Sequence, residues 1–219
     1  IEHAQATLDN TVLRIDNLLN SVETAVENIS LVVKDNIDKP DYLYGITEYL
    51  VRSEEYLCGS AVAFEPNYYP EKGHFFSPYS YRDGDSIRSK QLGNEDYEYH
   101  YMDWYQIPKL LNKPYWSEPY FDQGGADAIM TTYSYPLYDD NGKLFAILTA
   151  DISLELFAEE INSIKTYSNA FNAMIGRGGT VLVHRNKDFI LNLILHQTKT
   201  GNIFKHRLAV VGRAGSDDE

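Results

Sequence analysis

The sequence predicts an α+β fold in which a long N-terminal helix precedes two modules built on antiparallel sheets, the second of them incomplete. The helix is predicted by apolar residues that are spaced alternately four and three positions apart. These residues are Leu8, Val12, Ile15, Leu19, Val22, Val26, Ile29 and Val33. The sheets are predicted by two hairpin signals, the turn Asp139–Gly142 and the glycine pair Gly178–Gly179.

The long helix ends before Pro40, and Asp41 is a suitable N-cap for a second helix that runs to about Arg52. The hydrophobic period then becomes that of strands. The predicted strands are Gly59–Phe64, Phe75–Tyr81, Ala128–Tyr138 and Lys143–Asp151, and the mixed segment Tyr97–Trp104 fits either a strand end or a short helix.

Helical spacing returns at Ser153–Ile164, with Ser153 as its N-cap, and a second hairpin joins Ala170–Gly176 to Thr180–His184. A further helix is predicted near Lys187–Leu195, and the tail after Leu208 is too short to complete a second module. The predicted organisation is a helix at 1–36, a first module with its linking helix at 37–164, and a partial second module at 165–219.

Composition excludes several functional classes. The net charge of -13 and the pI of about 4.8 disfavour binding to nucleic acid or to anionic lipid. The single cysteine, Cys58, lies in an apolar run without a neighbouring histidine, so we expect a buried residue rather than a nucleophile.

The chain starts at Ile1 and has no apolar run near the roughly 20 residues that cross a bilayer. We therefore expect a fragment of a longer protein.

No motif indicates a metal, a cofactor or catalysis. The six histidines show no HExxH spacing, and no GxSxG is present. Asp139, Asp140 and Asn141 resemble a calcium loop, but the terminal Glu of such a loop is missing and a hairpin turn explains them. The sequence therefore predicts a protein that is not an enzyme and holds no cofactor.

Aromatic residues are abundant in the predicted first module, where most of the 18 tyrosines lie. The candidate ligand-binding aromatics are Tyr97, Tyr99 and Tyr101, which share one face if the segment is extended, together with Trp104, Tyr105, Trp116 and Tyr120. Asp122 and Asp151 could accept hydrogen bonds from a ligand. This set favours an amine, a purine-like ring or a sugar. Two alternatives remain open: the aromatics form the core, and Asp151 caps the linking helix.

Two motifs carry a resemblance to a known family. Trp116–Asp122 and Tyr135–Gly142, the latter leading to Thr149–Ser153, resemble the double Cache (dCache) family of sensor domains over roughly residues 1 to 200. The resemblance implies two PAS-like modules outside the cytoplasm, periplasmic or extracellular, in a receptor of the cytoplasmic membrane. It also implies a ligand pocket in the membrane-distal module, here about residues 41–151.

Members of that family that bind amino acids share a set of six ligand-contacting positions. The matching residues in this chain are Tyr97, Met102, Trp104, Tyr105, Tyr120 and Asp151. Met102 stands where those members have an arginine, and a methionine cannot grip a carboxylate through bidentate hydrogen bonds. The resemblance therefore implies a small-molecule site without the usual carboxylate grip.

We expect the sensing input domain of a transmembrane receptor, a histidine kinase in the first instance, with a chemoreceptor or another output equally consistent. The expected partners are a small-molecule ligand and a second copy of the chain bound through the N-terminal helix, but no nucleic acid. One alternative is a secreted carbohydrate-binding or glycoside-hydrolysing module that uses Asp122 and Asp151 as acid and base. Another is a module that only dimerises or binds a protein.

Overall fold

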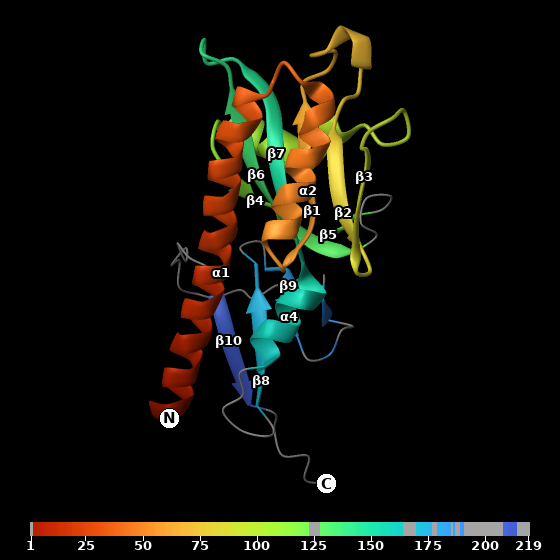
Figure 1. The fold of residues 1–219 in the computed structure, drawn as a ribbon. Helices are drawn as coiled ribbons and strands as arrows, with labels where there is room; N and C mark the ends of the chain where they lie inside the picture. The colour runs from red at the N-terminus through yellow and green to blue at the C-terminus, as the bar shows by residue number, and fades with distance from the viewer. Residues whose placement is uncertain are drawn as a thin grey trace. The chain divides into compact units, whose positions relative to one another are not determined.

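The computed structural model describes residues 2–122, 128–163, 170–176, 179–184, 186, 189–190 and 208–213 (Figure 1). The chain divides into two compact units. One unit comprises residues 20–117 and 121–153 and contains most of a seven-stranded sheet. The other comprises residues 1–19, 118–120 and 154–219 and contains a three-stranded sheet.

Helix α1 spans Glu2–Asp35. Most residues of its predicted heptad stripe are buried. They are Ile15, Leu19, Val22, Val26, Ile29 and Val33. Leu8 and Val12 are half-buried. This stripe therefore packs within the chain, because side chains that its own chain covers are not available to a second copy.

A short 3-10 helix, η1, spans Pro40–Tyr42 and leads directly into helix α2, Leu43–Ser53. The apolar side of α2 is buried as the periodicity predicts. Asp41 does not cap α2; instead, its Oδ1 accepts a hydrogen bond from Lys72 Nζ at 2.5 Å. The fixed φ of Pro40 starts this helical turn without a side-chain cap.

The main sheet has the strand order β3-β2-β1-β7-β6-β4, and β5 pairs with β6 beside this path. Each of the five pairings along the path is antiparallel. The strands are β1 Leu57–Phe64, β2 Pro78–Asp83, β3 Ser86–Gln91, β4 Tyr115–Trp116, β5 Tyr120–Phe121, β6 Ile129–Tyr138 and β7 Leu144–Ser153. The central strand β1 is buried along its whole length, as its continuous apolar sequence predicts.

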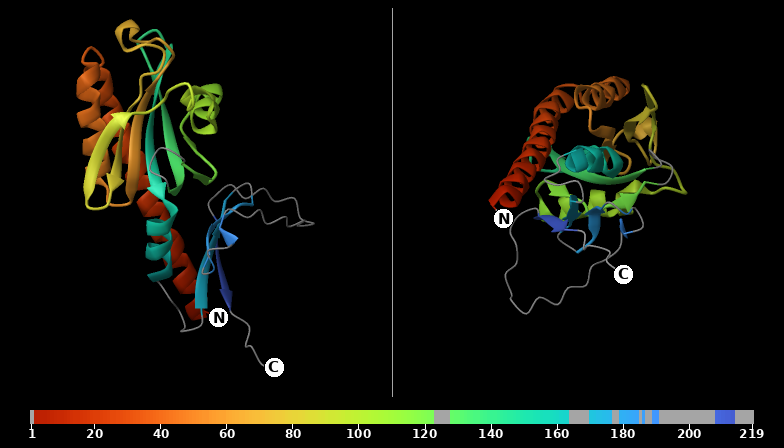
Figure 2. Two further views of the ribbon diagram at one scale, coloured as in Figure 1. Left: turned by 90° about the vertical axis from the view of Figure 1, so that its right-hand side faces the viewer. Right: turned by 90° about the horizontal axis from the view of Figure 1, so that it is seen from below.

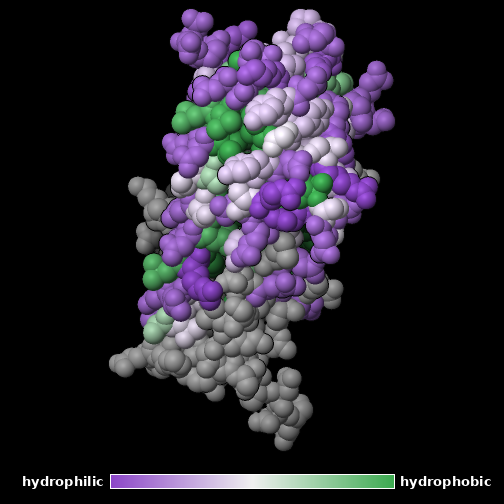
Figure 3. All heavy atoms as spheres, viewed as in Figure 1, coloured by the Kyte–Doolittle hydropathy of each residue, from purple (hydrophilic) through white to green (hydrophobic). Residues whose placement is uncertain are grey.

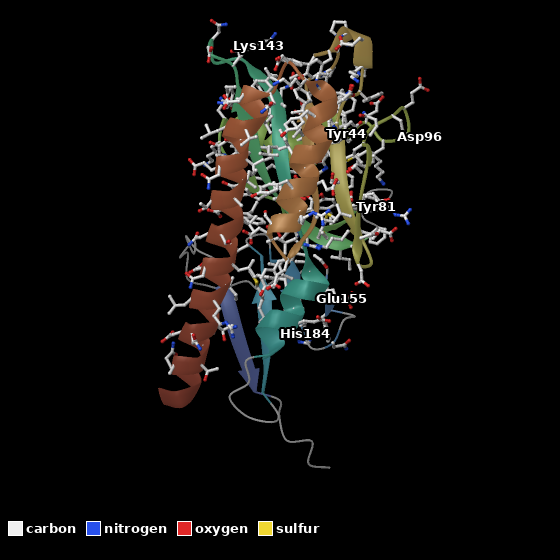
Figure 4. The ribbon with its side chains drawn as sticks, in the orientation of Figure 1. Tyr44, Tyr81, Asp96, Lys143, Glu155 and His184 are labelled. Atoms are coloured by element: carbon white, nitrogen blue, oxygen red, sulfur yellow. The ribbon has the colours of Figure 1, made fainter. Side chains whose placement is uncertain are left out.

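The turn between β6 and β7 is the predicted hairpin rather than a calcium loop. Asp139 Oδ1 accepts hydrogen bonds from the backbone N–H groups of Asn141 at 2.9 Å and Lys143 at 2.8 Å. Gly142 has a φ of 76°, which few other residues adopt at low cost. The Asp139 carboxylate is thus occupied by the turn, which ends at Lys143 (Figure 4).

Three segments between β1 and β6 differ from the prediction. The strand predicted at Phe75–Tyr81 starts only at Pro78, after the 3-10 helix η2, Pro70–Lys72. Strand β3 was not predicted, because its largely exposed sequence has no apolar alternation. The mixed segment around residues 97–104 is helical: the 3-10 helix η3 spans Tyr99–Tyr101, and helix α3 spans Asp103–Leu111.

Helices cover both faces of the main sheet. Figure 2 shows α2 and the second half of α1 on one face and α3 on the other. Hydrogen bonds join the first face to its helices: Trp116 Nε1 donates to Glu23 Oε1 of α1 at 2.7 Å, and Thr47 of α2 lies 2.8 Å from Ser80 Oγ of β2. The two faces therefore have different helical covers.

The second unit contains helix α4, Leu154–Ser163, and the strands β8 Ala170–Ile175, β9 Val181–Val183 and β10 Leu208–Arg213. Its strand order is β10-β8-β9, and both pairings are antiparallel. The predicted linking helix and second hairpin are confirmed. The helix predicted near Lys187–Leu195 lies, apart from residues 189–190, outside the described residues.

Within the described residues, no helix is both long and apolar enough to span a membrane. The face of the molecule in Figure 3 is mainly hydrophilic, with apolar patches in a few places, some of them along α1. Leu13 and Leu31 are both exposed on this helix.

Candidate functional site

The candidate site lies on the face of the main sheet that points away from α1 and α2. Strand register defines this face, because residues paired across an antiparallel sheet project to the same side and alternate along each strand. Trp116 pairs with Tyr133 and bonds to α1, so both residues project to the face that the helices α1 and α2 cover. Thr132 immediately precedes Tyr133 in β6 and therefore projects to the opposite face. Thr132 pairs with Asp151, which pairs with Gly59. A row of three residues thus crosses β6, β7 and β1.

Asp151 is the acidic residue of this row and is 4% exposed. Its Oδ1 accepts a hydrogen bond from Thr132 Oγ1 at 2.8 Å. Asp151 lies within β7, so its carboxylate does not cap α4, contrary to the alternative interpretation. Gly59 leaves space for this carboxylate. A Cβ at position 59 would lie 2.7 Å from Asp151 Oδ2 and 2.5 Å from the Tyr79 hydroxyl oxygen, both too close.

A second acid, Asp122, lies close enough to Asp151 for their charges to interact, and it is 6% exposed. Burial and then the charge of Asp122 raise the pKa of Asp151 to about 7, against the lowering effect of the Thr132 hydrogen bond. Asp151 is thus a carboxyl group that titrates near neutral pH. Burial also raises the pKa of the Cys58 thiol, with further contributions from Asp151 and Asp122, so Cys58 has no thiolate character.

Tyr97 and Trp104 belong to the same cluster. Burial raises the pKa of the Tyr97 hydroxyl, as do the charges of Asp122 and Asp151, whereas a side-chain hydrogen bond with Trp104 lowers it. Four of the predicted site residues therefore lie close enough to interact: Tyr97, Trp104, Asp122 and Asp151. Two of these groups are aromatic and two are acidic.

Tyr99 and Tyr105 are core residues that support this cluster. Both are fully buried, and their rings are 5.6 Å apart. The Tyr99 hydroxyl donates to the Phe64 carbonyl at 2.7 Å, and the Tyr105 hydroxyl donates to Glu65 Oε1 at 2.5 Å. For these two tyrosines the core interpretation agrees with the geometry.

The remaining predicted site residues lie outside the row of Thr132, Asp151 and Gly59. Tyr101 is 68% exposed, because the 3-10 turn replaces the extended strand that would have aligned it with Tyr97. Met102 is the residue immediately before α3 and is half-buried. Trp116 projects to the helix-covered face, where it bonds to Glu23. Tyr120 is half-buried in β5, which pairs with β6.

Sequence reasoning missed several residues on the face of Asp151. Tyr81 of β2 is labelled in Figure 4. It stacks on Tyr79 of the same strand at 5.7 Å, and Lys90 Nζ of β3 lies 4.6 Å from the centroid of the Tyr81 ring. Ser134 pairs with Thr149 of β7 two positions along from the Thr132–Asp151 pair, so it shares their face. Its hydroxyl is fully buried and has no hydrogen-bond partner among the residues that the structure describes.

Comparisons with known proteins identify the family and the fold of the chain. The family described as methyl-accepting chemotaxis protein-like, first PDC sensor domain, matches residues 43–159. No curated protein matches the chain. The extracellular domain of the histidine kinase soHK1S-Z6 is 27% identical, with a TM-score of 0.69 over 83% of this chain and 69% of that one.

Two further solved structures are similar. The extracellular domain of the histidine kinase mmHK1S-Z3 is 25% identical, with a TM-score of 0.72 over 86% of this chain and 73% of that one. The ligand-binding domain of the amino acid chemoreceptor PctB of Pseudomonas aeruginosa, in complex with L-Gln, is 18% identical. Its TM-score is 0.66 over 88% of this chain and 72% of that one, which shows a common fold.

Proposed function

The chain belongs to the family of methyl-accepting chemotaxis protein-like first PDC sensor domains, and we propose that it senses a small amine through the acidic pair Asp122 and Asp151. The observation that carries the proposal is the buried Asp151 carboxylate, which lies beside a second acid and two aromatic residues. The family match lies inside the predicted first module, 37–164, which we propose as the ligand-binding module.

An amine fits the chemistry of this cluster better than an anion does. Buried carboxylates accept hydrogen bonds and favour a cation, whereas an anionic group beside them would be repelled. Tyr97 and Trp104 supply aromatic surface, which also attracts a cation. Met102 offers no charge for a carboxylate, so an amine without a carboxylate is the preferred ligand over a free amino acid.

The glycoside-hydrolysing alternative finds no support in the comparisons, since the matching family and the similar structures are sensor domains. We propose that the chain itself is not catalytic and that an output module, such as a histidine kinase, lies elsewhere in a membrane-anchored receptor. The similar structures at 25% identity and above are extracellular domains, which supports the same location for this chain.

A thermal-shift screen tests the ligand proposal. The wild-type chain and Asp151→Ala are heated with primary amines, purines, sugars and amino acids. We expect primary amines to raise the Tm of the wild type but not of Asp151→Ala, because only the former retains the carboxylate. Asp96→Ala is the control, since Asp96 is an exposed acid in the loop before Tyr97 (Figure 4). Equal shifts in all three proteins would contradict the proposed site.

We also propose that a second copy of the chain packs along the outer face of α1. Six exposed positions on this helix follow alternating spacings of four and three. They are Leu13, Asn17, Asn20, Thr24, Glu27 and Leu31. This spacing forms a second seam on the helix, with apolar ends and a polar centre, and asparagines in such a seam favour pairing of two helices.

Sedimentation velocity over a range of protein concentrations tests the dimer. Leu31→Asp should shift the monomer–dimer equilibrium towards monomer, because it places a charge in the seam of each copy. Leu110→Asp is the matched control, since Leu110 is 75% exposed but lies on α3. An unchanged equilibrium in Leu31→Asp would contradict a dimer through this face.

A further inference from the structure

Among the described residues, the groups around Asp151 come from several strands and loops, and one of them is a second acid. They are Cys58 and Gly59 of β1, Tyr79 of β2, Thr132 of β6, Asp122 after β5, and Tyr97 with Trp104 around η3. Two basic side chains lie on neighbouring strands, Arg82 on β2 and Lys90 on β3.

Both basic side chains have other partners. The Arg82 guanidinium donates to three backbone carbonyls, those of Leu57 at 2.6 Å, Val51 at 2.7 Å and Glu54 at 3.0 Å. It therefore holds the C-terminal end of α2 against the sheet. The Lys90 ammonium lies over the Tyr81 ring. Within the described part of the chain, Asp151 accepts a side-chain hydrogen bond from the neutral Thr132 hydroxyl.

Two carboxyl groups that are each more than nine-tenths buried cannot both carry a full charge at low cost. When two acids interact closely, the pair binds its protons in coupled steps. A proton held between the two acids relieves the repulsion in the absence of a cation. A bound ammonium group would have the same effect and would make the proton unnecessary.

The unpartnered Ser134 hydroxyl is an independent sign that a ligand reaches this face. It is fully buried on the same side of the sheet as Thr132 and Asp151, two residues along β6. A buried hydroxyl without a partner is costly, and a ligand atom that bonds to it removes this cost. The Ser134 hydroxyl and the Asp151 carboxylate can thus both accept hydrogen bonds from a ligand that donates them.

We propose that the site exchanges a proton for its ligand: the acidic pair Asp122 and Asp151 holds one proton when empty and releases it when a cationic amine binds. The inference rests on the proposed function, since the same acids bind the amine. One ammonium enters as one proton leaves to solvent, so the net charge of the site is unchanged. Affinity then falls about tenfold for each pH unit below neutrality and levels off above it. The affinity of the receptor for its ligand therefore depends on the external pH.

The first part of the test needs no ligand. The Tm of the wild type, Asp151→Asn and Asp96→Asn is measured from pH 5 to pH 8.5. A carboxyl group with a raised folded-state pKa stabilises the fold at low pH and loses this contribution as the pH rises through that value. We therefore expect the Tm of the wild type and of Asp96→Asn to fall towards pH 8, and a much flatter profile for Asp151→Asn. The same fall in Asp151→Asn would overturn the inference.

The second part measures the exchange itself. Phenethylamine and ethanolamine are titrated calorimetrically into the wild type at pH 6 and pH 8. Each titration is run in two buffers without a primary amine whose ionisation enthalpies differ, phosphate and MES at pH 6 and phosphate and HEPES at pH 8. We expect close to one proton released per amine bound at pH 6 and close to none at pH 8. Binding at pH 6 without proton release would overturn the inference. A pH-dependent Tm without binding of either amine would support the shared proton and contradict the proposed amine ligand instead.

Discussion

The two faces of the main sheet differ in how their buried polar side chains are hydrogen-bonded. On the face that α1 and α2 cover, the buried Ser80 hydroxyl is bonded: its Oγ lies 2.8 Å from Thr47 Oγ1 and 2.7 Å from Oγ of the exposed Ser89. On the opposite face, Ser134 is equally buried but has no partner, and Asp151 is held beside a second acid. The buried Ser80 hydroxyl on the packing face is thus satisfied within the protein, whereas the buried Ser134 hydroxyl on the site face is free to bond to a ligand.

The largest expected effect is a loss of packing on the helix-covered face. Leu50 of α2 is fully buried there, so Leu50→Ala should lower the free energy of unfolding by about 2–5 kcal/mol. Leu110→Ala, at an exposed position, should change it by no more than about 0.5 kcal/mol. Urea denaturation measures both. A small effect at Leu50 would show that α2 is not part of the core.

A pair of glycine substitutions separates the site from the helical cover. Gly59→Ala places a methyl group against Asp151 Oδ2 and the Tyr79 hydroxyl, so it should cost about 1–3 kcal/mol and abolish amine binding. Gly45→Ala in α2 meets no atom within 4 Å and should stabilise the protein by about 0.5–1 kcal/mol. Denaturation and calorimetry measure both properties. Unaltered amine binding in Gly59→Ala would place the ligand elsewhere.

The smallest effects come from two buried serines, one on each face. Ser80→Ala breaks a closed hydroxyl network and should cost about 1 kcal/mol. Ser134→Ala removes a hydroxyl without a partner, so the ligand-free protein should keep its stability while its affinity for the amine falls. Equal losses of stability for the two variants would remove the distinction between the faces.

Elements with strong local patterns were predictable from sequence. The heptad stripe of α1, the apolar strand β1 and the Asp139–Gly142 hairpin were all confirmed, because burial and turn geometry follow from local spacing. Strand β3 was missed, since its Ser, Arg and Lys residues carry no apolar alternation and it is defined by pairing with β2.

The candidate site was less predictable, because strand register decides it. Asp151 could be chosen from sequence, and the hairpin signal could have identified Thr132 as its partner across β6 and β7. No local pattern shows that Gly59 leaves room for Asp151, or that Trp116 and Asp151 lie on opposite faces. The 3-10 turn at η3 also separates Tyr101 from Tyr97 in a way that tyrosine spacing alone does not reveal.

The most direct test of the central claim is mass spectrometry of small molecules released when the purified chain is denatured. The wild type, Asp151→Ala and Asp96→Ala are purified in parallel from the same medium supplemented with primary amines. The account predicts that an amine is released in near-equal amounts from the wild type and Asp96→Ala, and is absent from Asp151→Ala. An amine retained by Asp151→Ala at the wild-type level would contradict it, because the ligand would then bind independently of the buried carboxylate.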